Sequence, residues 1–148
     1  MDIKLDTTDF TTTTNRLIGK LLSFEGETDA VAHEIVLTLT QQLMSESIKR
    51  APFLEGHLQA SHHYVIEKNP AGFGYVGTVF IPVNAPAAAY AIVRHETDYK
   101  LGPESLRKQA GQPEKVGKKY LERAFYENVD KVDNYIKARL TRFFKDGL

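Results

Sequence analysis

The sequence contains no cysteine, which excludes disulfide bonds, thiolate metal sites and a cysteine nucleophile. It also has no net charge, because 19 Lys and Arg residues balance 19 Asp and Glu residues. A protein that binds DNA through its phosphates normally carries an excess of basic residues. No apolar run approaches the roughly 18 residues of a membrane span, and no basic segment followed by an apolar stretch opens the chain. We therefore expect neither a membrane segment nor a secretory signal.

The rest of the composition is ordinary for a globular protein: 148 residues, of which 42% are hydrophobic and 26% charged. This length fits one domain with a sizeable core, so we expect residues 1–148 to form a single domain. The charge is unevenly spread. Residues 1–99 hold 7 Lys or Arg and 12 Asp or Glu, whereas residues 100–148 hold 12 and 7. This asymmetry indicates either one basic surface helix or complementary ends that stack head to tail.

The clearest periodicity predicts an amphipathic helix over residues 28–50. Val31, Ile35 and Leu39 are spaced four residues apart on one face, and Pro52 ends the helix because it pushes the preceding residue out of the α region. Apolar residues at helical spacing predict three further helices, at residues 9–24, 84–95 and 118–144. We expect the two long helices to share one core, whose predicted members include Leu39, Leu43, Val132 and Ile136.

Alternating apolar and polar residues predict two strands, at residues 58–67 and 73–83. Turn-forming residues 69–72 lie between them, so the two strands are expected to form an antiparallel hairpin. A third strand is expected at residues 1–8 or near residues 92–97. The order of elements predicts an α+β fold in which a small antiparallel β-sheet packs against two long α-helices, with a shorter helix and a long loop.

The long loop is predicted at residues 98–117. This segment contains three glycines and two prolines among many charged residues, and a loop of such length inside a compact domain is usually functional or disordered. We expect it to be mobile in the isolated subunit and to become ordered against a neighbouring subunit. The side chains predicted to form this assembly interface are Lys100, Leu101, Arg107, Lys108 and Lys115.

The residue patterns do not predict a catalytic, cofactor or metal site. His95 and Glu96 resemble the start of a zinc-protease helix, but Tyr99 stands where the second histidine is required. His62 and His63 are adjacent on a predicted strand, so they are expected to point to opposite faces and cannot bind one ion together. No Gly-x-Ser-x-Gly elbow occurs, and the glycine-rich stretch near the second strand precedes the strand instead of following it.

The last predicted helix carries many basic residues, which raises the question of nucleic-acid binding. These residues are interspersed with acidic ones, namely Glu122, Glu127, Asp130 and Asp133. A helix face of mixed charge is usually a solvated or subunit-facing surface. We therefore do not expect the helix to bind DNA directly.

Three separated segments share a pattern with one protein family. Residues 51–61 run alanine–proline, then Glu55-Gly56, then leucine-x-x-serine, and residues 90–97 begin tyrosine–alanine and continue to an acidic residue. Residues 117–124 contain lysine-x-leucine-glutamate at the predicted start of the last helix. In this order and spacing the segments resemble phage minor tail and tail-completion proteins, in which threonine usually stands at the position of Glu55.

The resemblance covers residues 28–148, with residues 1–27 as an N-terminal arm and helix. It implies a structural virion protein of a tailed phage, placed at the neck or tail end and assembled in the host cytoplasm. It further implies a ring of identical subunits, hexameric in a tail or dodecameric in a connector. Implied partners are neck, portal-side and tail-tube proteins, with DNA only as passing cargo and no membrane. No catalytic residue or cofactor is implied.

Two other functions remain open on the sequence alone: a monomeric module that binds another phage protein, and a small phage-encoded enzyme. The three segments can also be explained as junctions of the fold. Pro52 ends a helix, Gly56 lets the chain turn, and Tyr90 has a ring to bury and a hydroxyl to pair. Glu96 follows an apolar stretch, where it can cap a helix or bridge to a basic residue.

Overall fold

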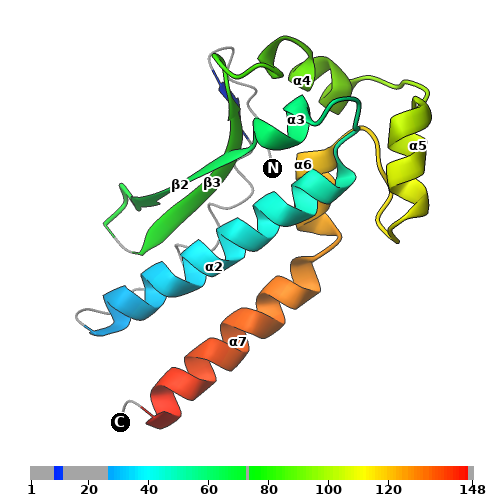
Figure 1. The fold of residues 1–148 in the computed structure, drawn as a ribbon. Coiled ribbons are helices and arrows are strands. Elements are labelled where there is room, and N and C mark those ends of the chain that lie inside the picture. The colour runs from blue at the N-terminus through cyan, green and yellow to red at the C-terminus, as the bar shows by residue number, and fades with distance from the viewer. Residues whose placement is uncertain (1–8, 12–26, 73, 147–148) are drawn as a thin grey trace.

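The structure is a computed structural model that describes residues 9–11, 27–72 and 74–146 (Figure 1). Its elements in chain order are β1 (Asp9–Thr11), α2 (Glu27–Arg50), α3 (His57–Ala60), β2 (His63–Lys68), β3 (Tyr75–Pro82), α4 (Ala88–Glu96), α5 (Pro103–Ala110), α6 (Tyr120–Tyr126) and α7 (Val129–Asp146). A small antiparallel sheet with helices packed against it confirms the predicted α+β class.

Helix α2 lies along one face of the sheet and organises the molecule (Figure 1). Ala32, Ile35, Val36 and Leu39 are buried at spacings of three and four residues, so one stripe of the helix faces the interior. The helix ends at Arg50, shortly before Pro52, as the proline requires. The predicted amphipathic helix at residues 28–50 is confirmed.

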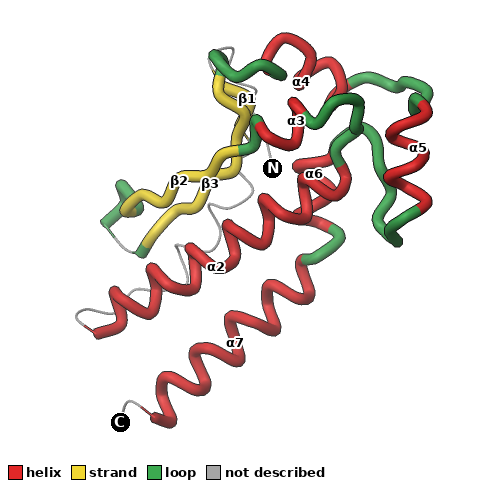
Figure 2. The backbone as a smooth tube through the Cα atoms, viewed as in Figure 1, coloured by secondary structure: helices red, strands yellow, loops and turns green. Residues whose placement is uncertain are grey.

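The sheet has the strand order β1-β3-β2, with both neighbouring pairs antiparallel (Figure 2). Alternate residues of β3 are buried, beginning at Tyr75, as expected of a strand with one face against the core. Gly77 allows the closest approach to α2, because a Cβ atom there would lie 1.7 Å from Oγ1 of Thr40. The predicted hairpin of residues 58–67 and 73–83 is confirmed in its pairing.

Several predicted boundaries are wrong. Residues 9–11 form a strand where a helix was expected at 9–24, and the rest of that prediction lies outside the described residues. Residues 57–60 form helix α3, so the first hairpin strand begins only at His63. Gly56 turns the chain at φ +84°, and its carbonyl oxygen accepts a 2.9 Å bond from the Ala60 amide, which closes a helical turn.

The third strand is β1, not a segment near residues 92–97, which belong to helix α4. The other predicted place for it, residues 1–8, lies outside the described residues. Helix α4 covers Ala88–Glu96 and confirms the shorter helix predicted at residues 84–95. Its alanine-rich first turn suits a helix, because alanine loses no side-chain entropy there.

The helix predicted at residues 118–144 is divided into α6 and α7. Asn128 lies at the break, and its side-chain amide donates a 2.9 Å hydrogen bond to the carbonyl oxygen of Ala124. The backbone amide of Asn128 bonds instead to the carbonyl oxygen of Phe125, three residues back. Asparagine side chains compete with helical backbone bonding in this way. The break lets α7 run beside α2 at a different angle from α6 (Figure 1).

The loop predicted at residues 98–117 contains a helix, α5, and that prediction is wrong. Gly102 precedes Pro103 at the first turn, Glu104 lies in the first turn, and Arg107 and Lys108 lie in the last. Proline is tolerated at a helix start, and this charge order complements the helix dipole. The glycines and prolines therefore bound a short helix instead of preventing one.

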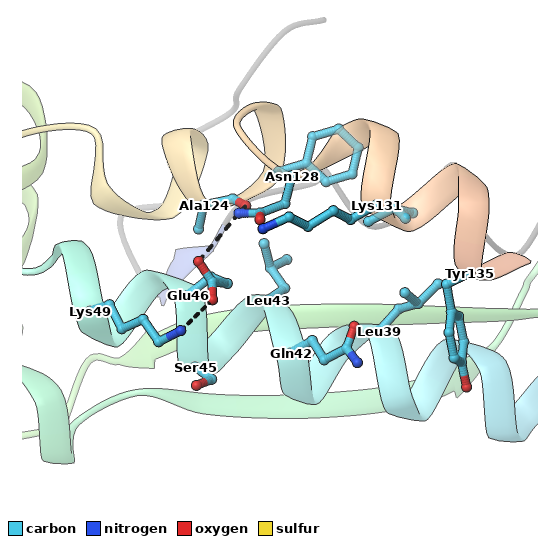
Figure 3. A pocket seen from close by; sticks show the side chains of 12 residues that line it. Leu39, Gln42, Leu43, Ser45, Glu46, Lys49, Ala124, Asn128, Lys131 and Tyr135 are labelled. Atoms are coloured by element: carbon cyan, nitrogen blue, oxygen red, sulfur yellow. Dashed lines mark hydrogen bonds and ion pairs between the residues drawn. The ribbon is translucent and has the colours of Figure 1, made fainter. Parts of the chain in front are cut away.

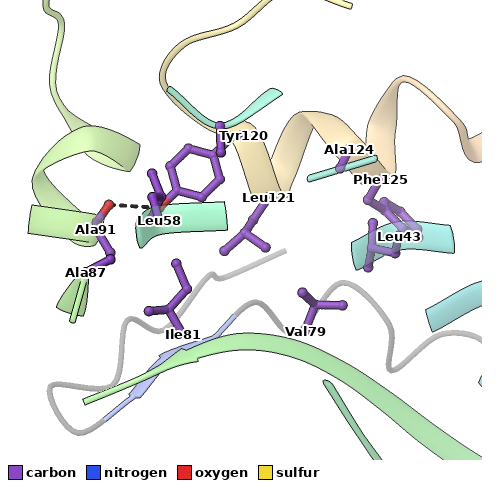
Figure 4. Packing of buried hydrophobic residues seen from close by; sticks show 11 residues of the cluster. Leu43, Leu58, Val79, Ile81, Ala87, Ala91, Tyr120, Leu121, Ala124 and Phe125 are labelled. Atoms are coloured by element: carbon purple, nitrogen blue, oxygen red, sulfur yellow. Dashed lines mark hydrogen bonds between the residues drawn. The ribbon is translucent and has the colours of Figure 1, made fainter. Parts of the chain in front are cut away.

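The buried side chains form two clusters joined along α2. One gathers around Tyr120 and Leu121 of α6 and includes Leu43 (Figure 4). The other contains Leu39 together with Ile136 of α7, and Val132 packs against it half-buried. The single core predicted for these α2 and α7 residues is thus divided, with Leu43 on one side and Leu39 on the other.

Candidate functional site

The three family-like segments meet at the side chain of Tyr120. This residue opens α6 within the third segment and is fully buried. Its hydroxyl donates a 3.0 Å hydrogen bond to the carbonyl oxygen of Ala91 in the second segment. Leu58 of the first segment belongs to the same buried cluster, as Figure 4 shows. Segments whose contacting residues are about thirty positions apart in the chain therefore form one contacting unit.

Ion pairs and hydrogen bonds connect the second segment to the third. The Lys119 ammonium lies 2.6 Å from Oε2 of Glu96, and Oε1 of Glu96 lies 2.6 Å from Nδ1 of His95. The Lys119 amide also donates a 2.8 Å bond to the His95 carbonyl oxygen. Burial raises the pKa of Glu96, but the hydrogen bonds from Lys119 and His95 outweigh burial and hold that pKa below its usual value. The expected bridge from Glu96 to a basic residue is confirmed.

The imidazoles of His95 and His62 both pack against the ring of Tyr120. His95 lies edge-on at 4.9 Å between ring centroids, and His62 is tilted at 5.9 Å. Nδ1 of His62 donates to the Leu58 carbonyl oxygen at 2.8 Å, which leaves Nε2 to accept from the Ser47 hydroxyl at 2.9 Å. Burial lowers the pKa of His62 to about 4. His62 is therefore neutral near pH 7 and joins α3 to α2.

A cleft of about 570 Å³ opens on the surface next to this centre. The loop before α3, helix α4 and the segment leading into α5 form its walls. Its lining mixes aromatic and apolar side chains with charged ones, and Arg94 lies 4.7 Å above the ring of Tyr99 as a cation–π pair. Leu54 on the rim is 75% exposed. Residues that line the cleft include Phe53, Leu54, Tyr90, Arg94, Tyr99 and Lys100.

Helix α5 is held in place by bonds to backbone atoms at the end of α2. The Lys108 ammonium donates to the carbonyl oxygens of Ile48 at 2.5 Å and Ala51 at 2.6 Å. The hydroxyl of Ser105 bonds to both the amide and the carbonyl oxygen of Phe53. The last carbonyls of a helix lack intrahelical partners, so Lys108 satisfies acceptors that α2 leaves open. Burial lowers the pKa of Lys108 to about 8.

The five predicted interface residues do not form one surface. Lys100 is exposed and lines the cleft, with Leu101 half-buried next to it in the chain. Arg107 is exposed and pairs with Glu104, whereas Lys115 lines a separate hollow beside Arg50. Lys108 bonds within its own subunit, as described above. Of the five, the structure thus brings Lys100 to the lining of the cleft and places Arg107, Lys108 and Lys115 elsewhere.

A second hollow, of about 500 Å³, lies between α2 and α7 (Figure 3). Leu39, Leu43 and Tyr135 form apolar walls. Glu46 stands at one end, where it accepts a 2.6 Å bond from Lys49 and a 3.4 Å bond from Asn128. Glu46 and Lys49 are paired with each other, and this arrangement favours a structural role for the pair.

The clefts do not bring together a nucleophile and a base. Ser105 lines the first cleft, but its hydroxyl is occupied by the backbone of Phe53. Within the described residues, no group of three His, Asp or Glu side chains has the geometry to hold a metal ion. None of the described helices is long and apolar enough to cross a membrane. The arrangement is suited to binding a surface by its exposed apolar and aromatic side chains.

Sequence reasoning missed Ser105 and Tyr99, and it predicted Lys108 for an interface instead of the end of α2. A signal for α5 was present, since Gly102-Pro103-Glu104 places proline and an acidic residue at a helix start. No sequence signal identifies the carbonyl oxygens that Lys108 caps, because they lie 57 and 60 residues away. The chain matches no protein-family model, and searches of curated proteins and of solved structures find no matching protein.

Proposed function

We propose that the protein is a structural subunit of a tailed bacteriophage, a ring-forming tail-completion or head–tail joining protein of the neck or tail end. One observation carries the proposal. The three segments that resemble this family are far apart in the chain, yet they contact one another around Tyr120. Chance matches to three short patterns have no reason to meet in space, whereas the motifs of one fold do.

Exposed apolar side chains near the cleft support an assembly role. Leu54, Val93 and Leu106 are each more than half exposed, and Tyr90 is 37% exposed. Leu54 and Tyr90 line the cleft, while Val93 and Leu106 belong to the adjoining helices α4 and α5. Apolar groups gathered in this way usually mark a protein-binding surface. We therefore place the subunit contact at this cleft, with Lys100 among the polar residues that line it.

A ring requires that each subunit present two different surfaces, so that contacts run head to tail and close by rotation. The uneven charge of the chain fits this requirement, because residues 1–99 carry a net −5 and residues 100–148 a net +5. Complementary potentials steer the encounter of two such surfaces. The basic side chain of Lys100 at the cleft is accordingly expected to meet an acidic surface from the first two-thirds of the neighbouring chain.

The proposal is tested by comparing the purified chain with two variants in which an exposed apolar residue becomes acidic. Leu54→Asp places a charge on the cleft rim, and Val83→Asp is its control at an exposed residue just after β3. We expect rings from the unaltered chain and from Val83→Asp. Leu54→Asp is expected to give folded subunits that form no rings, as judged by circular dichroism and light scattering.

Two results would contradict the proposal. The first is a chain that stays monomeric at every concentration, which instead favours a monomeric module that binds another protein. The second is a ring that Leu54→Asp leaves intact, which places the contact away from the cleft.

A further inference from the structure

Strand β2 lies at the edge of the sheet. Its pairing partner among the described residues is β3 alone, and β1 lies on the opposite side of β3 (Figure 2). The strand is exposed at every position except Ile66, which is half-buried. An edge strand presents unpaired amide and carbonyl groups that can template another strand. Between His63 and Lys68 the sequence has no proline to block such pairing.

One hydrogen bond at the hairpin end fixes which backbone groups face outward. The Asn69 amide donates to the carbonyl oxygen of Gly74 at 2.9 Å, so this pair is hydrogen-bonded. Bonded and non-bonded pairs alternate along an antiparallel ladder. With the observed register, Val65 bonds inward to Thr78 of β3, whereas the amides and carbonyls of Tyr64 and Ile66 point away from β3, where the described residues supply no strand partner.

The two faces of β2 differ in character. Tyr64 and Ile66 face α2, since the Tyr64 hydroxyl accepts a 3.0 Å bond from Gln41 and Ile66 packs against the α2 cluster. His63, Val65 and Glu67 alternate with them and lie on the outer face. Val65 is 38% exposed there. The outer face therefore carries a histidine, a valine and a glutamate at alternate positions of the strand.

We propose that β2 pairs antiparallel with β2 of a second copy of this chain, about a two-fold axis that passes between the two Val65 residues. In this register Tyr64 of each copy stands opposite Ile66 of the other. These are the residues whose backbone groups face outward, so each such pair exchanges both N–H···O bonds. The two Val65 side chains meet as a close, non-hydrogen-bonded apolar pair.

Side-chain polarity selects the same register. His63 of one copy lies opposite Glu67 of the other on the outer face, and the symmetric contact repeats this pair on the far side of the axis. An imidazole can pair with a carboxylate, whereas two carboxylates directly opposite each other are unfavourable. A register centred on Ile66 places Glu67 opposite Val65 and loses both complementary pairs. The second copy is thus the occupant that the strand's own sequence fits.

This contact is separate from the ring contact of the proposed function. A two-fold contact uses the same patch on both copies and closes after two, whereas a ring needs two different patches. The two proposals use different surfaces, namely β2 here and the cleft near Leu54 there. Each can therefore fail without the other, and the Leu54→Asp chain allows the two-fold contact to be measured without rings.

Disulfide trapping tests the register directly, because the chain has no cysteine of its own. Val65→Cys is compared with His63→Cys, both in the Leu54→Asp background. Facing Cα atoms in a non-hydrogen-bonded pair lie about 4.5 Å apart, within the range that a disulfide spans. Two copies of position 63 are four residues out of register and cannot reach each other. We expect a disulfide-linked dimer from Val65→Cys, formed at least ten times faster than from His63→Cys.

A second comparison tests the backbone bonds. Tyr64→Pro removes an outward amide and spares the ladder to β3, while Tyr64→Ala removes the same side chain and keeps the amide. By sedimentation velocity, in the same background, we expect dimers of the Tyr64→Ala chain and monomers of the Tyr64→Pro chain. Equal trapping at positions 63 and 65, or dimers that persist in a folded Tyr64→Pro chain, would overturn the proposal.

Discussion

The hydroxyl of Tyr120 at the start of α6 donates a 3.0 Å hydrogen bond to the carbonyl oxygen of Ala91 in the middle of α4. Ala91 and Tyr120 are both fully buried, so the bond links two helices inside the core. Because α6 packs against α2, this contact also positions α4 relative to the longest helix. The cleft lies on α4, and its shape depends on this link.

Removing the Tyr120 hydroxyl is expected to destabilise the fold without breaking it. Tyr120→Phe removes this buried hydrogen bond, but the Ala91 carbonyl lies inside α4 and keeps its intrahelical donor, so the loss costs about 0.5–1.5 kcal/mol. The free energy of unfolding, measured by urea denaturation, should fall by that amount. Tyr126→Phe on the same helix, where the ring is 47% exposed, is the control and should change stability little. Equal effects at both positions would contradict a structural role for the bond.

Acid is expected to weaken the fold through His62. Its pKa is about 4 in the folded chain and about 6.5 when unfolded, so between these values the unfolded state binds a proton that the folded state does not. The free energy of unfolding therefore falls as the pH drops from 6.5 towards 4, by up to about 3 kcal/mol. His62→Gln should flatten the slope between pH 7 and 5. His57→Gln, at an exposed residue, is the matched control.

Lys108 is expected to contribute to stability, whereas Lys115 in the same segment is not. Lys108→Met leaves the carbonyl oxygens of Ile48 and Ala51 without their ammonium donor, at a cost of about 1–3 kcal/mol. Hydrogen exchange should also show faster opening of α5, because that helix loses its link to α2. Lys115→Met changes an exposed side chain and should stay within about 0.5 kcal/mol. Indistinguishable melting curves for the two variants would refute the capping role.

Gly77 and Thr40 are expected to be energetically coupled. A Cβ atom at position 77 would lie 1.7 Å from the Thr40 Oγ1 atom, so Gly77→Ala forces α2 away from β3 and costs about 1–3 kcal/mol. Thr40→Ala removes the colliding atom. In a double-mutant cycle, the two changes together should be less harmful than the sum of their separate effects. Strict additivity would show that the two elements do not pack this closely.

The elements that the sequence predicts best are those with a residue pattern that is local and continues over many residues. The helix at residues 28–50 follows from an unbroken apolar repeat and a terminal proline, and the hairpin follows from alternation around a turn. The break between α6 and α7 was missed because an apolar stripe continues through it, while one asparagine side chain captures a backbone carbonyl. The periodicity of apolar residues does not reveal where a side chain competes for a backbone hydrogen bond of the helix.

The candidate site was harder to predict than the fold. Lys100, which was predicted for an assembly interface, lines the cleft, whereas Lys108 was predicted for the same interface and instead caps α2 inside the subunit. A charged residue in a segment rich in glycine and proline suggests exposure, and only the three-dimensional proximity of α5 to the end of α2 reveals its partner. The convergence of three segments on Tyr120 likewise depends on long-range packing that no local pattern encodes.

The measurement that tests the central claim most directly is rotational averaging of electron micrographs of the purified full-length chain, together with its native mass. The proposed function predicts closed rings of one size, hexameric or dodecameric, whose mass is that multiple of the subunit. Particles without rotational symmetry, and a native mass that remains that of one subunit at every concentration, would contradict the claim that this chain builds a ring.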